Sequence, residues 1–187
     1  LLSYFVAILL YDNQFSLASI SNRKQLFDQM FELFFQRQSV KERSAGSGLE
    51  YILADISRYK YLLEIIAVCA WQKGDRSVGA SIVEQALHKD RPARQILYAN
   101  SPDSDGVTEQ VGAITSGVIN SFFVGRKQEQ PTGVFEFTHK AFQEYLTASR
   151  IIRVAREVAC GLHDRSYTVD EAHGRWMEEF GERGISP

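Results

Sequence analysis

The stretch from Gly74 to Ser81, GDRSVGAS, has the glycine spacing and the terminal serine of a phosphate-binding loop. In such a loop, backbone N–H groups surround the phosphates and a lysine before the serine reaches the β- and γ-phosphates. Ala80 stands at the position of that lysine, and no apolar strand ending in acidic residues follows to hold Mg²⁺. A helix cap explains the pattern better, and we expect no nucleotide hydrolysis by this chain alone.

Three potential metal ligands, Cys160, His163 and His173, lie near the end of the chain. A structural zinc site normally takes four ligands, whereas these are three at irregular spacing. We therefore expect two surface histidines and a core cysteine instead of a metal site. The sequence also has no serine or cysteine followed by a recognisable base and orienting acid, so it gives no support for hydrolase chemistry.

The segment 135–148, FEFTHKAFQEYLTA, carries the most specific pattern in the sequence. It strongly resembles the F-x-H-x-x-F-x-E-Y/F-L-x-A signature of NACHT-type STAND NTPases, signalling ATPases that include animal NOD-like receptors and bacterial antiviral proteins. In that family the signature ends a winged-helix domain. The opening LLSYFVAILLY resembles the segment in which the family's helical domain leaves the ATPase core, and RKQLFDQMFELFF is similar to the next helix of that domain. The resemblance thus extends from residue 1 to about residue 155.

The resemblance implies a role for His139, because the histidine of this signature contacts the β-phosphate of bound ADP and so locks the closed, resting state. Its position supports that role independently, since unpaired N–H groups and the positive dipole end at a helix start favour an anion. The same dipole disfavours imidazolium, so that a neutral His139 can offer one N–H to a phosphate. The alternative is a helix-start histidine that is bonded only to local backbone.

The family's phosphate loop, Mg²⁺-holding acids and Gly-x-Pro motif are not in this sequence and would lie before Leu1. Because residue 1 is Leu and not Met, we expect a piece of a longer protein. The resemblance implies ADP or ATP with Mg²⁺ as cofactor of the parent protein, and the ATPase core of the same parent chain as partner. It also implies a homo-oligomer on activation. The chain alone is expected to bind no nucleotide tightly and not to be an enzyme.

The elements that must position His139 are mainly helices. Apolar residues recur at three- and four-residue steps over 26–35, and again over 49–71, where the pattern fits one long helix or two short ones. Gly74 ends that pattern, and Ser77 can cap a short helix that follows. A further helix is expected over Val107–Ser121.

The segments 119–125 and 134–137 are β-branched and aromatic, and the polar loop RKQEQPTG between them predicts a two-stranded hairpin. Thr138 can then cap a long helix from His139 to about Val158. The expected apolar face of that helix comprises Phe142, Tyr145, Leu146, Ile152, Ala155 and Ala159, and its wet face Lys140, Gln143, Glu144, Thr147, Arg150 and Glu157.

Together these elements predict a mainly α fold, in which a helical domain is followed by a winged-helix domain with a small β-hairpin. We assign residues 1–47 to the helical domain and 48–159 to the winged-helix domain. Residues 160–187 form a C-terminal linker or the start of a further helical region. There, Trp176, Met177 and Phe180 predict a small helix.

The composition, with 44 % hydrophobic and 24 % charged residues among 187, is that of an ordinary globular protein. The apolar opening segment 1–11 is far shorter than the ~20 residues that cross a bilayer, and we expect a buried helix there. Two cysteines cannot form a disulfide framework. We therefore expect a cytoplasmic protein without a membrane partner.

A winged-helix DNA-binding transcriptional regulator is the alternative function. Its reading helix would be Val107–Ser121, which contains no Lys or Arg and includes Glu109, and its wing would offer only Arg126 and Lys127. The formal net charge of −2 also argues against a protein whose main task is to grip phosphates. A packing role for the winged helix is favoured, and we expect no nucleic-acid partner.

Overall fold

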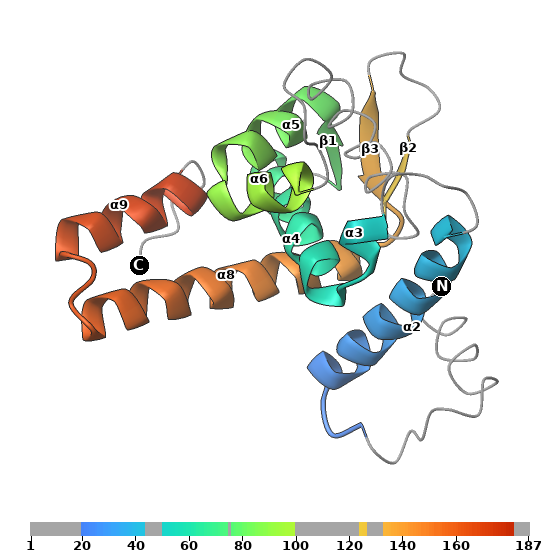
Figure 1. Ribbon diagram of the computed structural model, residues 1–187, viewed down its shortest axis with the longest axis horizontal. Coiled ribbons are helices and arrows are strands. Elements are labelled where there is room, and N and C mark those ends of the chain that lie inside the picture. Colours follow the sequence, from blue (N-terminus) through green and yellow to red (C-terminus); the bar gives the residue numbers. More distant parts are fainter. Residues whose placement is uncertain (1–19, 44–49, 75, 100–123, 127–132, 182–187) are drawn as a thin grey trace.

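The computed structural model describes residues 20–43, 50–74, 76–99, 124–126 and 133–181, and these are mainly helical (Figure 1). The expected helices at 1–11 and Val107–Ser121, and the first part of the expected hairpin at 119–123, lie outside the described residues. In chain order the elements are α2 (Arg23–Arg43), α3 (Glu50–Leu53), α4 (Ile56–Lys73), β1 (Ser77–Gly79), α5 (Ala80–Lys89), α6 (Arg91–Tyr98), β2 (Val124–Arg126), β3 (Val134–Phe137), α8 (Lys140–His163) and α9 (Val169–Phe180).

The segment 49–71 forms two helices, because the chain turns at Asp55 between α3 and α4. The Asp55 carboxylate accepts a hydrogen bond from the Ser57 N–H at 2.8 Å and so caps the first turn of α4. As predicted, α4 stops at Gly74, whose left-handed φ of 80° lets its N–H bond the Trp71 carbonyl at 3.0 Å.

The described strands form one antiparallel sheet in the order β1-β3-β2, so that the predicted hairpin gains a third strand. The prediction that Ser77 caps a helix is wrong, because Ser77 pairs with Glu136 in the sheet. Helix α5 begins only at Ala80, after Gly79, which makes no side-chain cap bond. The Ala80 N–H instead bonds the Gly133 carbonyl at 2.9 Å.

Helix α6 was not predicted from the sequence. Asp90 ends α5 and caps α6, accepting the Ala93 N–H at 2.8 Å, and Pro92 lies in the first turn of α6. Asp90 therefore both ends one helix and starts the next.

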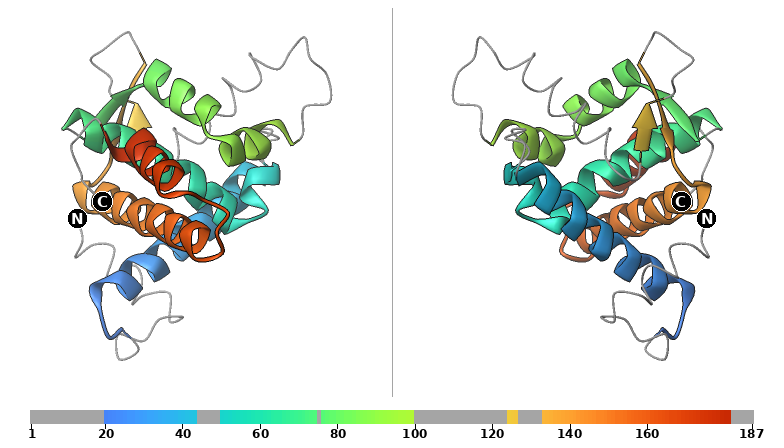
Figure 2. Two further views of the ribbon diagram at one scale, coloured as in Figure 1. Left: turned by 90° about the vertical axis from the view of Figure 1, so that its left-hand side faces the viewer. Right: turned by 90° about the vertical axis from the view of Figure 1, so that its right-hand side faces the viewer.

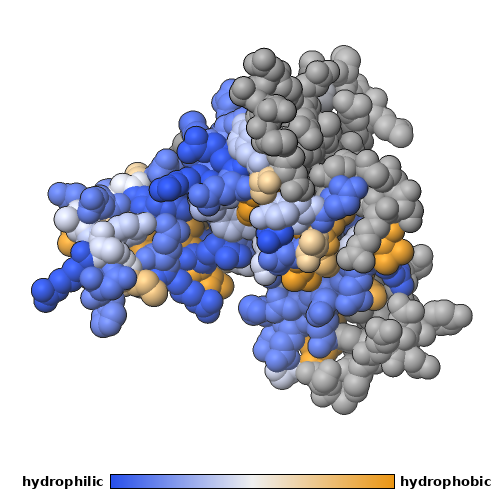
Figure 3. Space-filling view, in the orientation of Figure 1, coloured by the Kyte–Doolittle hydropathy of each residue, from blue (hydrophilic) through white to orange (hydrophobic). Residues whose placement is uncertain are grey.

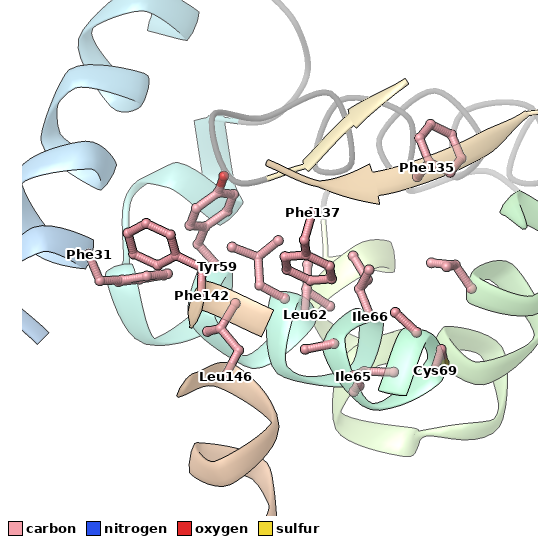
Figure 4. Packing of buried hydrophobic residues seen from close by; sticks show 14 of the residues in the cluster. Phe31, Tyr59, Leu62, Ile65, Ile66, Cys69, Phe135, Phe137, Phe142 and Leu146 are labelled. Atoms are coloured by element: carbon pink, nitrogen blue, oxygen red, sulfur yellow. The ribbon is translucent and has the colours of Figure 1, made fainter. Parts of the chain in front are cut away.

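One hydrophobic core joins α2, α4, β3 and α8 (Figure 4). Phe31 of α2 and Phe142 of α8 lie in it beside Tyr59 of α4, and all three side chains are almost fully buried. The core thus contains residues from both sides of the predicted boundary at residue 47. The predicted boundary at residue 159 falls inside α8.

Helix α8 differs from its prediction in its bounds and in its second half. It begins one residue later, at Lys140 with His139 as cap in place of Thr138, and it continues past Val158 to His163. Three residues expected on its apolar face are exposed, namely Ile152, Ala155 and Ala159, whereas Gln143, Thr147 and Arg150 from the expected wet face are buried. Helix α9 lies beside α8 (Figure 2) and covers the side that carries Arg150 and Val154, whereas Gln143 and Thr147 face the end of α4.

Candidate functional site

His139 lies at the junction of the central strand β3 and the long helix α8. Phe135 and Phe137 of β3 point into the core, and the Phe137 N–H bonds the carbonyl of Arg76 at 3.1 Å, just before β1. Two residues later the chain enters α8. The alternation of buried aromatic and half-buried residues in β3 therefore fixes where His139 stands.

The imidazole of His139 is half-buried and caps α8 with its Nδ1 atom. Nδ1 accepts the Ala141 N–H at 3.1 Å, and the His139 carbonyl accepts the Phe142 N–H at 3.0 Å. A nitrogen that accepts a hydrogen bond carries no proton, so the neutral ring has its proton on Nε2. The expected alternative, a hydrogen bond to local backbone, is thus present. It uses Nδ1, whereas a phosphate would be bound through Nε2–H.

Beside the start of α8 there is an open cleft of about 470 Å³. Its lining comes from the end of α4, from Arg76 and from the first two turns of α8, and comprises Trp71, Gly74, Arg76, Lys140, Gln143, Glu144 and Thr147. Each cation has a carboxylate partner, since Arg76 contacts Glu136 at 2.5 Å and Lys140 contacts Glu144 at 3.6 Å. His139 does not line this cleft, so the cleft and the histidine are two separate features of one region.

The phosphate-loop pattern at 74–81 does not fold as a loop. Gly74 ends α4, Ser77–Gly79 is a strand, and Ala80 is the first residue of α5. The first N–H of α5 is bonded to Gly133, so it is not directed at a ligand. The described residues of the pattern are therefore spread over the end of α4, β1 and the start of α5.

The three residues considered as metal ligands lie on α8 and α9. Cys160 is exposed, so the expectation of a core cysteine at this position is wrong, and His163 and His173 are exposed as well. Cys69 on α4 is the buried cysteine. Among the described residues no group of three His, Cys, Asp or Glu side chains could hold a metal ion.

The signature residue Tyr145 connects α8 to α2 and α4. Its hydroxyl donates to the carboxylate of Asp28 and accepts from the Lys60 ammonium at 2.5 Å, and Lys60 also lies 3.4 Å from Asp28. Burial would raise the pKa of Asp28, but hydrogen bonds from Lys24 and Tyr145 and the charge of Lys60 hold it below its ordinary value. The sequence pattern placed Tyr145 on the apolar face and did not show this polar contact.

The contacts of two arginines on α8, one buried and one exposed, also escaped the sequence pattern. Arg150, 1 % exposed, bonds Asp90 and Glu179, both at 2.7 Å. Arg153 bonds Glu64, which is fully buried on α4, at 2.7 Å. For Arg150, the signal that could have indicated its contact with Glu179 is the predicted helix around Trp176, which needed a face of another helix to pack against.

No protein-family model matches this sequence, and no curated protein and no solved structure matches the chain. In the described part of the chain, no helix has both the length and the apolar character that a membrane span requires.

Proposed function

We propose that this chain is the helical and winged-helix regulatory part of a NACHT-type STAND NTPase. It would hold the ADP-bound resting state of a cytoplasmic parent protein and transmit nucleotide exchange to oligomerisation in signalling or antiviral defence. The observation that carries the proposal is the hydrogen bond from the Ala141 N–H to Nδ1 of His139. Because Nδ1 is bonded to the first turn of α8, Nε2–H is the donor that a β-phosphate requires.

The mechanism is a difference in affinity between two arrangements of the parent protein. ADP with Mg²⁺ would be held by the ATPase core, and His139 would add a contact only when this part closes over the core. ADP then binds the closed arrangement more tightly, and exchange for ATP removes that contact and shifts the population towards the open, oligomerising form. The chain itself supplies a contact and no catalytic group.

The order of elements also supports a winged-helix assignment. In chain order α4, β1, α5 and α6 precede the antiparallel pair of β2 and β3, and the three strands share one sheet. This order is compatible with the domain that the signature ends in the family. No observation on the described residues favours the DNA-binding alternative, whose reading helix at Val107–Ser121 lies outside them.

The test separates the two roles of His139 in the parent protein that carries the ATPase core. His139→Ala removes both the cap and the Nε2–H donor, whereas His139→Ser restores a capping oxygen without a donor that reaches a ligand. We expect both variants to release bound ADP faster, by about tenfold or more for one lost hydrogen bond to a charged group. Both should also raise basal oligomerisation.

The proposal would be overturned if His139→Ser retained ADP as the wild type does, because the histidine would then be a cap only. Mobility shift of the chain on duplex DNA provides the comparison with the alternative function. Salt-sensitive, submicromolar binding there would support a DNA-binding regulator instead.

A further inference from the structure

Helix α9 packs on the rest of the molecule through a cluster that is separate from the main core. The cluster consists of the buried residues Val68 of α4, Val154 of α8, and Trp176 and Phe180 of α9. The two aromatic rings lie 4.8 Å apart, centroid to centroid. In Figure 3 the surface over α8 and α9 is mainly hydrophilic. A small satellite cluster of this kind can open without exposing the main core.

The polar contacts of α9 are dominated by charged groups. Glu179 accepts hydrogen bonds from Arg150 at 2.7 and 3.0 Å, and from Arg175 of its own helix at 3.0 Å. Arg175 also reaches Glu157 of α8 at 3.0 Å. A neutral bond, from the side chain of Gln72 on α4 to the carbonyl of Glu179 at 2.9 Å, also joins α9 to the rest of the molecule.

Each buried charge at this interface has a second partner on its own side. If α9 leaves, Arg150 keeps Asp90, at 2.7 Å, within the body of the molecule. Glu179 keeps Arg175, which moves with it on α9. Breaking a buried pair is strongly unfavourable mainly when an uncompensated charge remains buried. Undocking of α9 leaves neither Arg150 nor Glu179 as an uncompensated buried charge.

The start of α9 is stabilised by residues of its own first turn and cap. Thr168 and Glu171 form a capping box, in which the Thr168 hydroxyl accepts the Glu171 N–H at 3.2 Å and the Glu171 carboxylate accepts the Thr168 N–H at 2.7 Å. In the turn from α8, Arg165 has a left-handed φ of 61°, a strained conformation for a residue other than glycine. The capping box can therefore persist when α9 undocks, and the strain at Arg165 can be relieved at the same time.

We propose that α9 is a releasable clasp, which undocks from α8 and α4 and docks again as one unit while the main core stays folded. The shared carboxylate of Glu179 sets how often it opens. The inference does not depend on the nucleotide role of His139. Opening would uncover the apolar surface of Val68 and Val154.

Hydrogen exchange of the full chain, followed by mass spectrometry, tests the clasp. In Glu179→Gln the amides of α9 should exchange about ten- to a hundredfold faster, the effect of losing charge-assisted hydrogen bonds, while those of α4 keep their wild-type rates. The matched control is Glu178→Gln, which removes the same charge from the exposed neighbour on α9 and should change neither. Equal acceleration of α9 and α4, or no acceleration of α9, would overturn the proposal.

A second measurement on the wild type needs no variant to fold. With urea kept below the unfolding transition, exchange of α9 should depend little on urea concentration, because a local opening exposes little surface. Exchange of the buried α4 amides should rise steeply with urea. The same urea dependence for α9 and α4 would mean that α9 opens only with the whole fold and would contradict the clasp.

Discussion

At the scale of single residues, the informative feature is that polar side chains on α8 have fixed partners. His139 holds the helix start through Nδ1, Tyr145 donates to Asp28, and Arg150 is held between Asp90 and Glu179. Tyr145 and Arg150 lie on this one helix and reach three other segments, namely α2, the turn at Asp90 and α9. Helix α8, which begins inside the signature segment, therefore works as a connector in the fold, in addition to any contact with a ligand.

Tyr61 of α4 belongs to the same network, and its hydroxyl makes the stability of the fold depend on pH in the alkaline range. Its hydroxyl donates to the Asp90 carboxylate at 2.9 Å, and the Arg150 guanidinium lies 4.8 Å from its ring. Burial, together with the Asp90 charge and against the effect of Arg150, raises the pKa of Tyr61 to about 12. Its contribution to stability is complete below the ordinary value of 10.0 and is lost as the pH rises through about 12.

We therefore expect Tyr61→Phe to remove one late-titrating phenol from the alkaline absorbance titration and to weaken the fall in stability between pH 10.0 and about 12. Urea unfolding at a series of pH values provides the second readout. Tyr98→Phe, at the hydroxyl that contacts the exposed His88, is the control. The same late titration in Tyr61→Phe and wild type would contradict the assignment.

At the scale of elements, the sequence predicted those whose pattern is local. The repeating apolar steps of α2 and α4 and the alternation of β3 are complete within each segment. Strand β1 was missed because Ser77–Gly79 has only three residues and is defined by pairing with β3, far along the chain. Helix α6 was missed because the Asp-Arg-Pro that ends one helix also has the residues that start another.

The same reasoning explains what could be predicted of the site. His139 could be placed at a helix start, because a strand pattern and a helix pattern meet there. That it caps the helix itself depends on a ring conformation which spacing does not encode. The buried Arg150 was assigned to the wet face because a charge is normally solvated, and only two carboxylates from other elements reverse that expectation.

Two helical glycines differ in the space around them, Gly161 in the last turn of α8 and Gly174 on α9. A Cβ atom at Gly161 would lie 2.5 Å from the Tyr167 ring, whereas a Cβ atom at Gly174 would meet nothing within 4 Å. Gly161→Ala should therefore destabilise by about 1–3 kcal/mol through overpacking. Gly174→Ala should stabilise by up to about 1 kcal/mol through helix propensity.

Thermal unfolding followed by circular dichroism measures both glycine variants. We expect the changes in stability to have opposite signs in the two variants. Both substitutions add one methyl group to a helix, and they differ only in the atoms that this methyl group meets. If Gly161→Ala were as stable as Gly174→Ala, the ring of Tyr167 would have to move away without loss, and the packing at this turn would not hold α9 in place.

At the scale of the whole molecule, α2 and α9 lie at opposite ends of the long axis and are attached in different ways (Figure 1). Helix α2 contributes Phe27, Met30 and Phe31 to the main core and adds the contact of Asp28 with Tyr145 and Lys60. Helix α9 is attached outside the main core, through its satellite cluster, its ion pairs and the hydrogen bond from Gln72. Removing the charge of Glu179 should therefore loosen α9 alone. Removing the charge of Asp28 on α2 should instead lower the stability of the whole fold.

Acid unfolding tests the α2 attachment. The pKa of Asp28 lies below its ordinary value of 3.8, so its stabilising contribution is present above pH 3.8 and is lost as the pH falls through the lower, folded value. Asp28→Asn should reduce the free energy of unfolding by about 0.5–1 kcal/mol at neutral pH, the range for partly exposed pairs. The difference from wild type should shrink as the pH falls below 3.8, because both proteins then lack the charge.

Urea unfolding across that pH range measures the difference in stability, with Glu178→Gln as a control that should follow the wild type at every pH. A constant difference between Asp28→Asn and wild type would mean that the loss comes from packing, and that the carboxylate charge does not hold α2 to α4 and α8.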